Sequence, residues 1–259
     1  MDTDSATVQN PVPTTVLPFT STLNGQEYRL FFSLPASYEE SDQRYPVLYV
    51  LDGNGLYALV KQITELVPAP IREIPELIIV GVGYPLPTYA HTAKIRGRDL
   101  TFEPFTPQPD DHYPWGETGG AMTFLKTLTE EILPFIEGKY RTNPADRGLI
   151  GWSLSGGFAH RAIFLHPGLF SRVVMIDSFD EEAERLAEQP GCAAPVQRLF
   201  FGYASESATP ENEAQLSRHI EVVNGLGTRA KAHKFEGETH FTVVPAAISR
   251  GLREVYAEP

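Results

Sequence analysis

The hydrophobic residues of this chain gather in short, nearly continuous runs that polar segments separate. Four of these runs have strand length, and they cover residues 46–51, 76–84, 147–152 and 171–178. Continuous apolar runs are typical of strands whose two faces are both covered by helices. Three less continuous strand candidates lie at residues 27–35, 196–204 and 228–237. The pattern therefore predicts a central sheet that is buried on both faces.

Helical periodicity appears between these runs. Over residues 121–136 the apolar positions fall on one helical face, and Pro134 is expected to kink this helix near its end. Three more helices are predicted, at residues 158–166, at residues 210–225 with Thr209 as the N-terminal cap, and from about Thr242. Buried strands that alternate with amphipathic helices predict an α/β fold, with a mostly parallel sheet and helices on both faces.

Two segments depart from this pattern. Residues 1–14 are polar and acidic and predict a loose N-terminal leader, which leaves residues 15–259 as a single domain. Residues 84–119 are rich in proline and aromatic residues without a clear period, which predicts a long irregular loop that covers one end of the sheet. Packed surface filler is the alternative. The aromatic residues of this loop predict a pocket for a bulky or aromatic group: Tyr89, Phe102, Phe105, Tyr113 and Trp115.

Composition and charge narrow the classes of function. The 259 residues are 42% hydrophobic and 21% charged, which suits a globular protein rather than a disordered chain. The formal net charge of −12 disfavours a nucleic acid or an anionic membrane as partner, because phosphate contacts need clustered Lys and Arg. The single cysteine, Cys192, cannot form an internal disulfide, and the first residues resemble no signal peptide. A cytoplasmic location is therefore expected.

The stretch RGLIGWSLSGG, residues 147–157, carries two serines among small residues. A nucleophilic serine on a sharp strand-to-helix turn needs small residues two positions before and two positions after it, where the backbone approaches closely. Ser153 and Ser155 both meet this requirement. Ser153 directly follows the predicted strand, whereas Ser155 would require the strand to continue through Leu154. We therefore expect Ser153 to be the nucleophile, and a small-residue turn without chemistry is the alternative.

A serine hydroxyl needs a base, usually a histidine, to take its proton. In the strand order expected here, that base follows the last strand, on a loop before the last helix. His240 occupies this place in the segment FEGETHFTVVPAAISRGL. The carboxylate that orients the imidazole is expected after the strand at residues 196–204, where Glu206 comes first. Asp177, at the end of the preceding strand, is the alternative acid.

The negative charge that develops on the substrate oxygen requires backbone N–H donors. Leu154, the residue after the nucleophile, is expected to supply one of them. Gly53 or Asn54, in the turn LDGNG that follows the strand at residues 46–51, is expected to supply the other. The sequence contains no metal-ligand spacing, phosphate-binding loop or dinucleotide fingerprint, so we expect neither a metal nor a cofactor.

Four segments resemble a known family: YPVLYVLDGNG, GRDLTF, GGAMTFLKTLTEEILPFIEGKYRTNPADRGLIGWSLSGGFAHRAIFLHPGLFSRVV and GETHFTVVPAAISRGL. Together they are similar to the putative-esterase family of α/β-hydrolases, which includes siderophore esterases that open enterobactin- and salmochelin-type trilactones. S-formylglutathione hydrolase and the mycobacterial mycolyltransferases are more distant members. The resemblance covers nearly the whole chain. It implies an α/β-hydrolase fold and a serine carboxylesterase that acts on a small-molecule ester.

The resemblance also assigns residues to roles. The serine and histidine of the family fall on Ser153 and His240, and Glu206 is the positional match for the acid. Arg98 with Asp99 matches the segment that enters the substrate cleft, where an arginine would anchor an acidic or catechol-bearing substrate. A plain salt bridge from Arg98 to Asp99 or to another carboxylate is the alternative. The chain departs from the siderophore pattern in having few basic residues to receive an anionic ferric catecholate.

Two tryptophans, Trp115 and Trp152, complete the candidate contacts to substrate. The function expected from all these residues is ester hydrolysis through an acyl-enzyme. Acyl transfer, in which an alcohol or peroxide replaces water at the acyl-enzyme, is one alternative. A catalytically inactive binding protein on the hydrolase scaffold is another.

Overall fold

The computed structural model describes residues 14–66, 73–106 and 114–257, and these residues build one eight-stranded sheet. The strands are β1 (Thr15–Thr20), β2 (Glu27–Ser33), β3 (Tyr45–Val50), β4 (Ile78–Gly83), β5 (Thr142–Trp152), β6 (Arg172–Ile176), β7 (Arg198–Ala204) and β8 (Arg229–Phe235). Their order in the sheet is β1-β2-β4-β3-β5-β6-β7-β8. The strands from β4 to β8 in this order run parallel, and β1 and β2 are antiparallel at one edge. The predicted mostly parallel sheet is confirmed.

All seven predicted strands are present, and β1 is one that the hydrophobic pattern did not indicate. Its six residues are exposed or half-buried, and Pro18 interrupts the run. Proline is tolerated in an edge strand because one side of such a strand has no neighbour to bond. An exposed edge strand therefore lacks the apolar signal that identified the buried strands.

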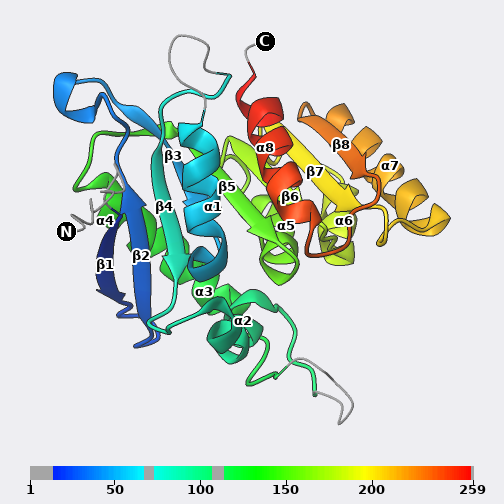
Figure 1. Cartoon of the computed structure of the whole chain (residues 1–259). Helices are drawn as coiled ribbons and strands as arrows, with labels where there is room; N and C mark the ends of the chain where they lie inside the picture. The colour runs from blue at the N-terminus through cyan, green and yellow to red at the C-terminus, as the bar shows by residue number, and fades with distance from the viewer. Residues whose placement is uncertain (1–13, 67–72, 107–113, 258–259) are drawn as a thin grey trace, which may run out of the picture.

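Helices cover both faces of this sheet, as Figure 1 shows. One face carries α1 (Gly53–Glu65) and α8 (Val243–Tyr256). The other face carries α5 (Leu154–Leu165), α6 (Glu181–Ala187), α7 (Pro210–Gly225) and the continuous run of α3 (Ala121–Lys126), η3 (Thr127–Ile132) and α4 (Leu133–Glu137). The last of these is the helix predicted at residues 121–136, and η3 within it is π-helical. Its wider turns come just before Pro134, which lacks the N–H that an α-helix would use there.

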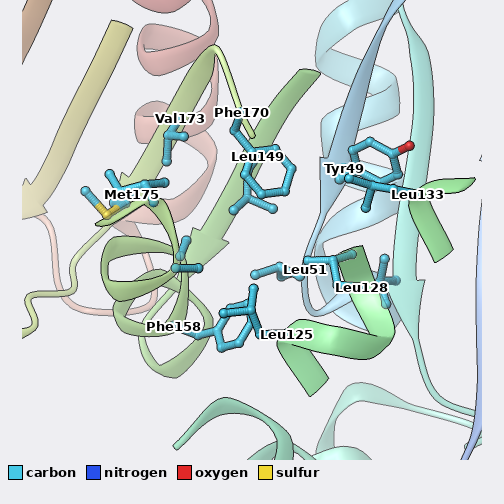
Figure 2. Packing of buried hydrophobic residues seen from close by; sticks show 14 of the residues in the cluster. Tyr49, Leu51, Leu125, Leu128, Leu133, Leu149, Phe158, Phe170, Val173 and Met175 are labelled. Carbon is cyan, nitrogen blue, oxygen red and sulfur yellow. The ribbon is translucent and has the colours of Figure 1, made fainter. Parts of the chain in front are cut away.

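Successive residues of the central strands pack into different cores. Val47 and Tyr49 of β3 face the helices α3 to α7, whereas Leu48 and Val50 face α1 and α8. This is why the strands read as continuous apolar runs. Figure 2 shows the first core, in which strand residues meet helix residues; its labelled members are Tyr49, Leu51, Leu125, Leu128, Leu133, Leu149, Phe158, Phe170, Val173 and Met175.

The segment at residues 84–119 is more regular than predicted. A short 3-10 turn, η2 (Tyr89–Thr92), leads into α2 (Ala93–Leu100), which packs against α3 and α5. The prediction missed this helix because two charged side chains, Arg96 and Asp99, are buried within it and mask its apolar face. Residues 107–113, and with them Tyr113, lie outside the described residues. The predicted leader also lies outside them, except for Thr14. No helix within the described ranges is long and apolar enough to cross a membrane.

Three neighbouring strands are followed by residues with an unfavourable backbone conformation. Asp52 after β3, Ser153 after β5 and Asp177 after β6 have φ values of 54°, 56° and 44°, and no other described residue except glycine has a positive φ. Such conformations are costly for residues with a Cβ and gather at functional sites. Because β3, β5 and β6 are parallel neighbours, the three residues share one edge of the sheet. This is the edge at which ligands bind in open α/β sheets.

Candidate active site

Ser153 lies on the turn between β5 and α5. Its backbone has φ 56° and ψ −124°, which places it outside both the strand and the helix. Its N–H donates to the carbonyl of Ile176 at the end of β6 (3.0 Å), and its own carbonyl accepts from Gly157 (3.0 Å). The next residue, Leu154, is the first residue of α5, where a backbone N–H has no partner within the helix. This is the geometry of a nucleophile elbow.

Small residues around the turn are required by close contacts. A Cβ on Gly151 would lie 2.3 Å from the carbonyl oxygen of Ser155, and a Cβ on Gly156 would lie 2.6 Å from the Cβ of Ser178. Ser155 is fully buried, and its hydroxyl accepts from the N–H of Trp152 and donates to the carbonyl of the same residue, both at 2.9 Å. Its hydroxyl is therefore occupied in bracing the turn, whereas Ser153 lines a cavity.

His240 lies on the loop between β8 and α8, as the sequence predicted. Its Nδ1 and Oδ2 of Asp177 are 2.6 Å apart, and the imidazole remains 34% exposed while the Asp177 side chain is 1% exposed. The ring carries its Nδ1 proton toward this carboxylate, which leaves Nε2 to accept a proton from another group. The carboxylate that meets the imidazole is thus the one at the end of β6, next to the strand that carries Ser153.

Asp177 is held as an anion by several donors. Besides the imidazole, the backbone N–H of Ala204 donates to its Oδ1 (3.0 Å) and the hydroxyl of Ser207 donates to its Oδ2 (2.8 Å). Burial alone would raise the pKa of this carboxyl, but the three hydrogen bonds outweigh burial and hold its pKa below the usual value. A buried, hydrogen-bonded carboxylate can orient an imidazole and stabilise its protonated form.

Glu206, expected to be the acid, occupies a different place. It lies two residues past the end of β7, is exposed, and accepts a hydrogen bond from the backbone N–H of His240 (3.0 Å). Its carboxylate therefore binds the main chain of the histidine loop and not the imidazole ring. The two carboxylates differ in where the backbone places them. The Asp177 carboxylate lies over the ends of β6 and β7, where the N–H of Ala204 binds it, whereas Glu206 follows after the chain has left the sheet.

Trp152 lies between the serine turn and the histidine loop. It is 7% exposed, and its indole Nε1 donates to the carbonyl of His240 (3.0 Å). Its ring is 5.2 Å from the imidazole centroid and 5.9 Å from the centroid of Tyr89. The structure thus gives this residue, expected to contact substrate, a contact with the histidine loop. Together with Glu206 it fixes both backbone groups of His240.

Gly53 and Asn54, the predicted oxyanion donors, open α1. A Cβ on Gly53 would lie 2.8 Å from the backbone of Gly81 in β4, so only glycine fits at this position. The Asn54 side chain brackets the chain after β4: it accepts from the N–H of Tyr84 (2.7 Å) and donates to the carbonyls of Tyr84 (3.0 Å) and Leu86 (3.1 Å). In the first turn of α1 the N–H groups of Gly55 and Leu56 donate to the carbonyl of Asp52 (2.8 Å and 3.0 Å). The N–H groups of Gly53 and Asn54 come before them, at the helix start, where the helix itself supplies no partner.

The sequence analysis missed the ion pair that supports this turn. Asp52, with its φ of 54°, accepts two hydrogen bonds from Arg96 of α2, at 2.6 Å and 2.9 Å, and both side chains are nearly inaccessible. The buried pair ties the long segment after β4 to the turn that carries Gly53 and Asn54. An arginine in a proline-rich segment gives no sequence signal of such a distant partner.

Arg98 and Trp115 take structural positions. Arg98 forms a salt bridge with Asp99 (2.6 Å) and donates to the side chain of Gln26 (3.2 Å), which is the alternative considered for it. Tyr28 donates to the same aspartate (3.0 Å). Trp115 packs beside α2, where a Cβ on Gly97 would lie 3.1 Å from its ring. Neither side chain lines the cavity beside Ser153.

That cavity has a volume of about 500 Å³ and lies on the side of Ser153 that faces α2. Phe102, Phe105, Phe158 and Phe179 form apolar parts of its wall. Arg161 of α5 forms bidentate hydrogen bonds to Asp180 (3.0 Å and 2.8 Å), a further ion pair to Glu103, and lies over the ring of Phe102 at 4.5 Å. The site therefore combines a serine, an aromatic pocket and an arginine whose charge two carboxylates already balance.

Known proteins resemble this chain over most of its length. A family model described as "Putative esterase" matches residues 21–234. The ferri-bacillibactin esterase BesA of Bacillus subtilis (strain 168) is 26% identical, over 93% of this chain and 89% of its own. The siderophore triacetylfusarinine C esterase of Aspergillus fumigatus is 27% identical, over 93% of both chains. The crystal structure of the BES protein from Bacillus cereus matches with a TM-score of 0.80 at 28% identity, covering 95% of this chain and 96% of that one.

Proposed function

This chain belongs to the putative-esterase family and is a carboxylic-ester hydrolase with an α/β-hydrolase fold, and we propose that it works through an acyl-enzyme formed by a Ser153–His240–Asp177 triad. The observation that carries this proposal is the 2.6 Å contact between His240 Nδ1 and the buried Asp177 carboxylate, one strand away from the turn on Ser153. Glu206 is assigned to the backbone of the histidine loop.

The first half of the reaction forms the acyl-enzyme. The Ser153 hydroxyl attacks the ester carbonyl carbon, and its proton passes to Nε2 of His240. Asp177 stabilises the imidazolium that results. The oxyanion of the tetrahedral intermediate accepts hydrogen bonds from the N–H of Leu154 and from the N–H of Gly53 or Asn54. When the intermediate collapses, the C–O bond to the alcohol breaks and His240 protonates the leaving alkoxide.

The second half releases the acid. Water attacks the acyl carbon while His240 takes its proton, and the same donors hold the second oxyanion. Collapse of this intermediate breaks the bond to Ser153 Oγ, which regains its proton from His240. An alcohol in place of water would give acyl transfer, so the product mixture formed with a competing alcohol distinguishes the two reactions.

The substrate we propose is a bulky ester or lactone without a large negative charge. The cavity beside Ser153 has aromatic walls, and its one described cation, Arg161, is paired with Asp180 and Glu103. An anion placed there would face carboxylates with no uncompensated cation among the described lining residues. Siderophore esters are the substrates named for two relatives. Those without a large negative charge are candidate substrates.

A fluorophosphonate probe tests the nucleophile directly. The wild-type protein is expected to be labelled once per chain on Ser153, and Ser153→Ala is expected to lose both labelling and ester hydrolysis, the latter by about 10⁴-fold or more. Ser178→Ala is the matched control, because Ser178 lines the same cavity and its hydroxyl has no role in the proposed steps. Labelling that survives in Ser153→Ala would contradict the proposal.

A further inference from the structure

Two histidines that the proposed reaction does not use lie against each other in the interior. Nε2 of His160 on α5 and Nε2 of His219 on α7 are 2.9 Å apart, and the two residues are 0% and 3% exposed. Aromatic rings surround both imidazoles: Phe164, Phe179 and Phe201. A buried pair of titratable rings in apolar surroundings needs a definite arrangement of protons.

The neighbours of the pair determine that arrangement. The backbone N–H of Asp180 donates to Nδ1 of His160 (3.2 Å), so this nitrogen carries no proton. The neutral ring of His160 then has its proton on Nε2 and donates it to Nε2 of His219, which must be bare. His219 consequently holds its proton on Nδ1. The structure thus contains a directed chain of hydrogen bonds from Asp180 through His160 to His219.

This chain requires both rings to be neutral. Burial lowers the pKa of His219 to about 4. Burial, together with repulsion from a protonated His219 and from Arg161, lowers the pKa of His160 well below its usual value. Asp180 contacts His160 through its backbone and directs its carboxylate to Arg161. Protonation of His219 at Nε2 would set two N–H donors against each other at 2.9 Å, and protonation of His160 at Nδ1 would set a second donor against the N–H of Asp180 at 3.2 Å.

The group that His160 holds is the segment at residues 177–180, which carries Asp177. Three residues of helix α5 contact this segment. Gly156 allows Ser178 to approach its backbone, Arg161 binds the carboxylate of Asp180 from the cavity side, and His160 binds the N–H of Asp180 from the interior. The same helix begins directly after Ser153. Nucleophile and acid are therefore positioned from one rigid element.

We propose that His160 is a positioning residue: by accepting the N–H of Asp180, with His219 fixing its tautomer, it holds the segment at residues 177–180 so that Asp177 stays aligned with His240. The inference rests on the proposed function for its effect on catalysis. The proton arrangement itself is independent of any reaction. His160 touches neither substrate nor the reacting atoms, and it acts through Asp180 and Asp177.

Nitrogen NMR of the wild-type protein at pH 7 tests the proton arrangement. The expected spectrum has Nδ1 of His160 and Nε2 of His219 without protons, and a low-field proton resonance from Nδ1–H of His240 bound to Asp177. A protonated Nδ1 on His160 would overturn the proposal, because that nitrogen could not accept from Asp180. Neither observation depends on turnover, so a failure of esterase activity would leave this result readable.

Two substitutions at position 160 test the effect on catalysis. His160→Asn keeps an oxygen near the place of Nδ1, and we expect kcat within about 3-fold of wild type. His160→Leu removes the acceptor, and we expect kcat to fall about 10- to 100-fold at nearly unchanged KM, with loss of the low-field resonance. Rates are divided by the concentration of active sites that fluorophosphonate titrates, so unfolded protein does not lower the measured kcat. Equal kcat and equal resonances in both variants would overturn the proposal.

Substitutions of His219 apply if His160→Leu does not fold. His219→Gln keeps an acceptor for His160 Nε2–H, whereas His219→Leu removes it. We expect the glutamine variant to retain kcat and the low-field resonance and the leucine variant to lower kcat by about 10-fold. A leucine variant with the wild-type kcat and resonance would overturn the proposed role of the pair.

Discussion

Two carboxylates lie close to His240, one after β6 and one after β7, and they differ in every respect that matters for catalysis. The Asp177 side chain is 1% exposed, the residue has a positive φ, and its carboxylate receives hydrogen bonds from an imidazole, a hydroxyl and a backbone N–H. Glu206 is exposed and accepts from the backbone of the histidine loop. The difference teaches that the carboxylate proposed as the acid is the one for which the fold has already supplied donors, whatever its place in chain order.

Asp177→Asn is expected to have the largest effect on this comparison. An amide can no longer balance the imidazolium and favours the wrong tautomer of His240, so kcat should fall by about 10⁴-fold while the protein still folds. The measurement is kcat for a nitrophenyl ester, referred to correctly folded protein. Should Asp177→Asn retain more than about a tenth of the activity while Glu206→Gln loses it, the assignment of the two carboxylates would be reversed.

Ser207→Ala is expected to have an intermediate effect. The variant loses one of the three donors that hold the Asp177 pKa below its usual value, so that pKa should rise. A carboxyl with a lowered folded-state pKa adds stability above its unfolded pKa of 3.8, and this stability is lost as pH falls through the folded value. The variant should therefore unfold at a higher pH during acid titration, with kcat about 3- to 10-fold lower at pH 7.

Circular dichroism during the acid titration measures this shift, and Ser207→Thr, which keeps the hydroxyl, is the control. An unchanged acid-unfolding midpoint in Ser207→Ala would show that this hydroxyl does not support the Asp177 anion.

Glu206→Gln is expected to have the smallest effect. The amide oxygen of glutamine can still accept from the N–H of His240, so kcat should stay within about 3-fold of wild type. Glu206→Ala removes the acceptor and should cost more than the glutamine variant, through a less ordered histidine loop. Comparison of kcat and KM for the two variants checks this order. A pH profile of kcat displaced in Glu206→Gln would contradict a role confined to the backbone.

Much of the fold could be predicted because the signal is local. Four strands are predicted by continuous apolar runs and three by less continuous patterns, and Gly151 with the small residues that follow it predicts the sharp turn after β5. The histidine loop was readable because it lies between the last strand and the last helix. The catalytic roles of Ser153 and His240 stay predictions.

The rest depends on contacts between distant segments. Whether the histidine meets Asp177 or Glu206 is decided by the backbone at each strand end, and the composition of the two strands does not reveal that conformation. The His160–His219 pair joins residues 59 positions apart and has no motif. Helix α2 was not predicted because its charged residues Arg96 and Asp99 are buried, Arg96 in a pair with Asp52. From the sequence alone, a charged residue is predicted to lie on the surface, because its buried partner becomes known only with the fold.

The ion pair between Asp52 and Arg96 has a consequence for engineering this scaffold by loop exchange. The segment after β4 is an obvious unit to transplant between relatives in order to change substrate preference. Replacing it without an equivalent arginine would strand a buried carboxylate beside the turn that opens α1, at a cost of about 3–5 kcal/mol. Chimeras that exchange Asp52 and Arg96 together, or neither, keep that charge compensated.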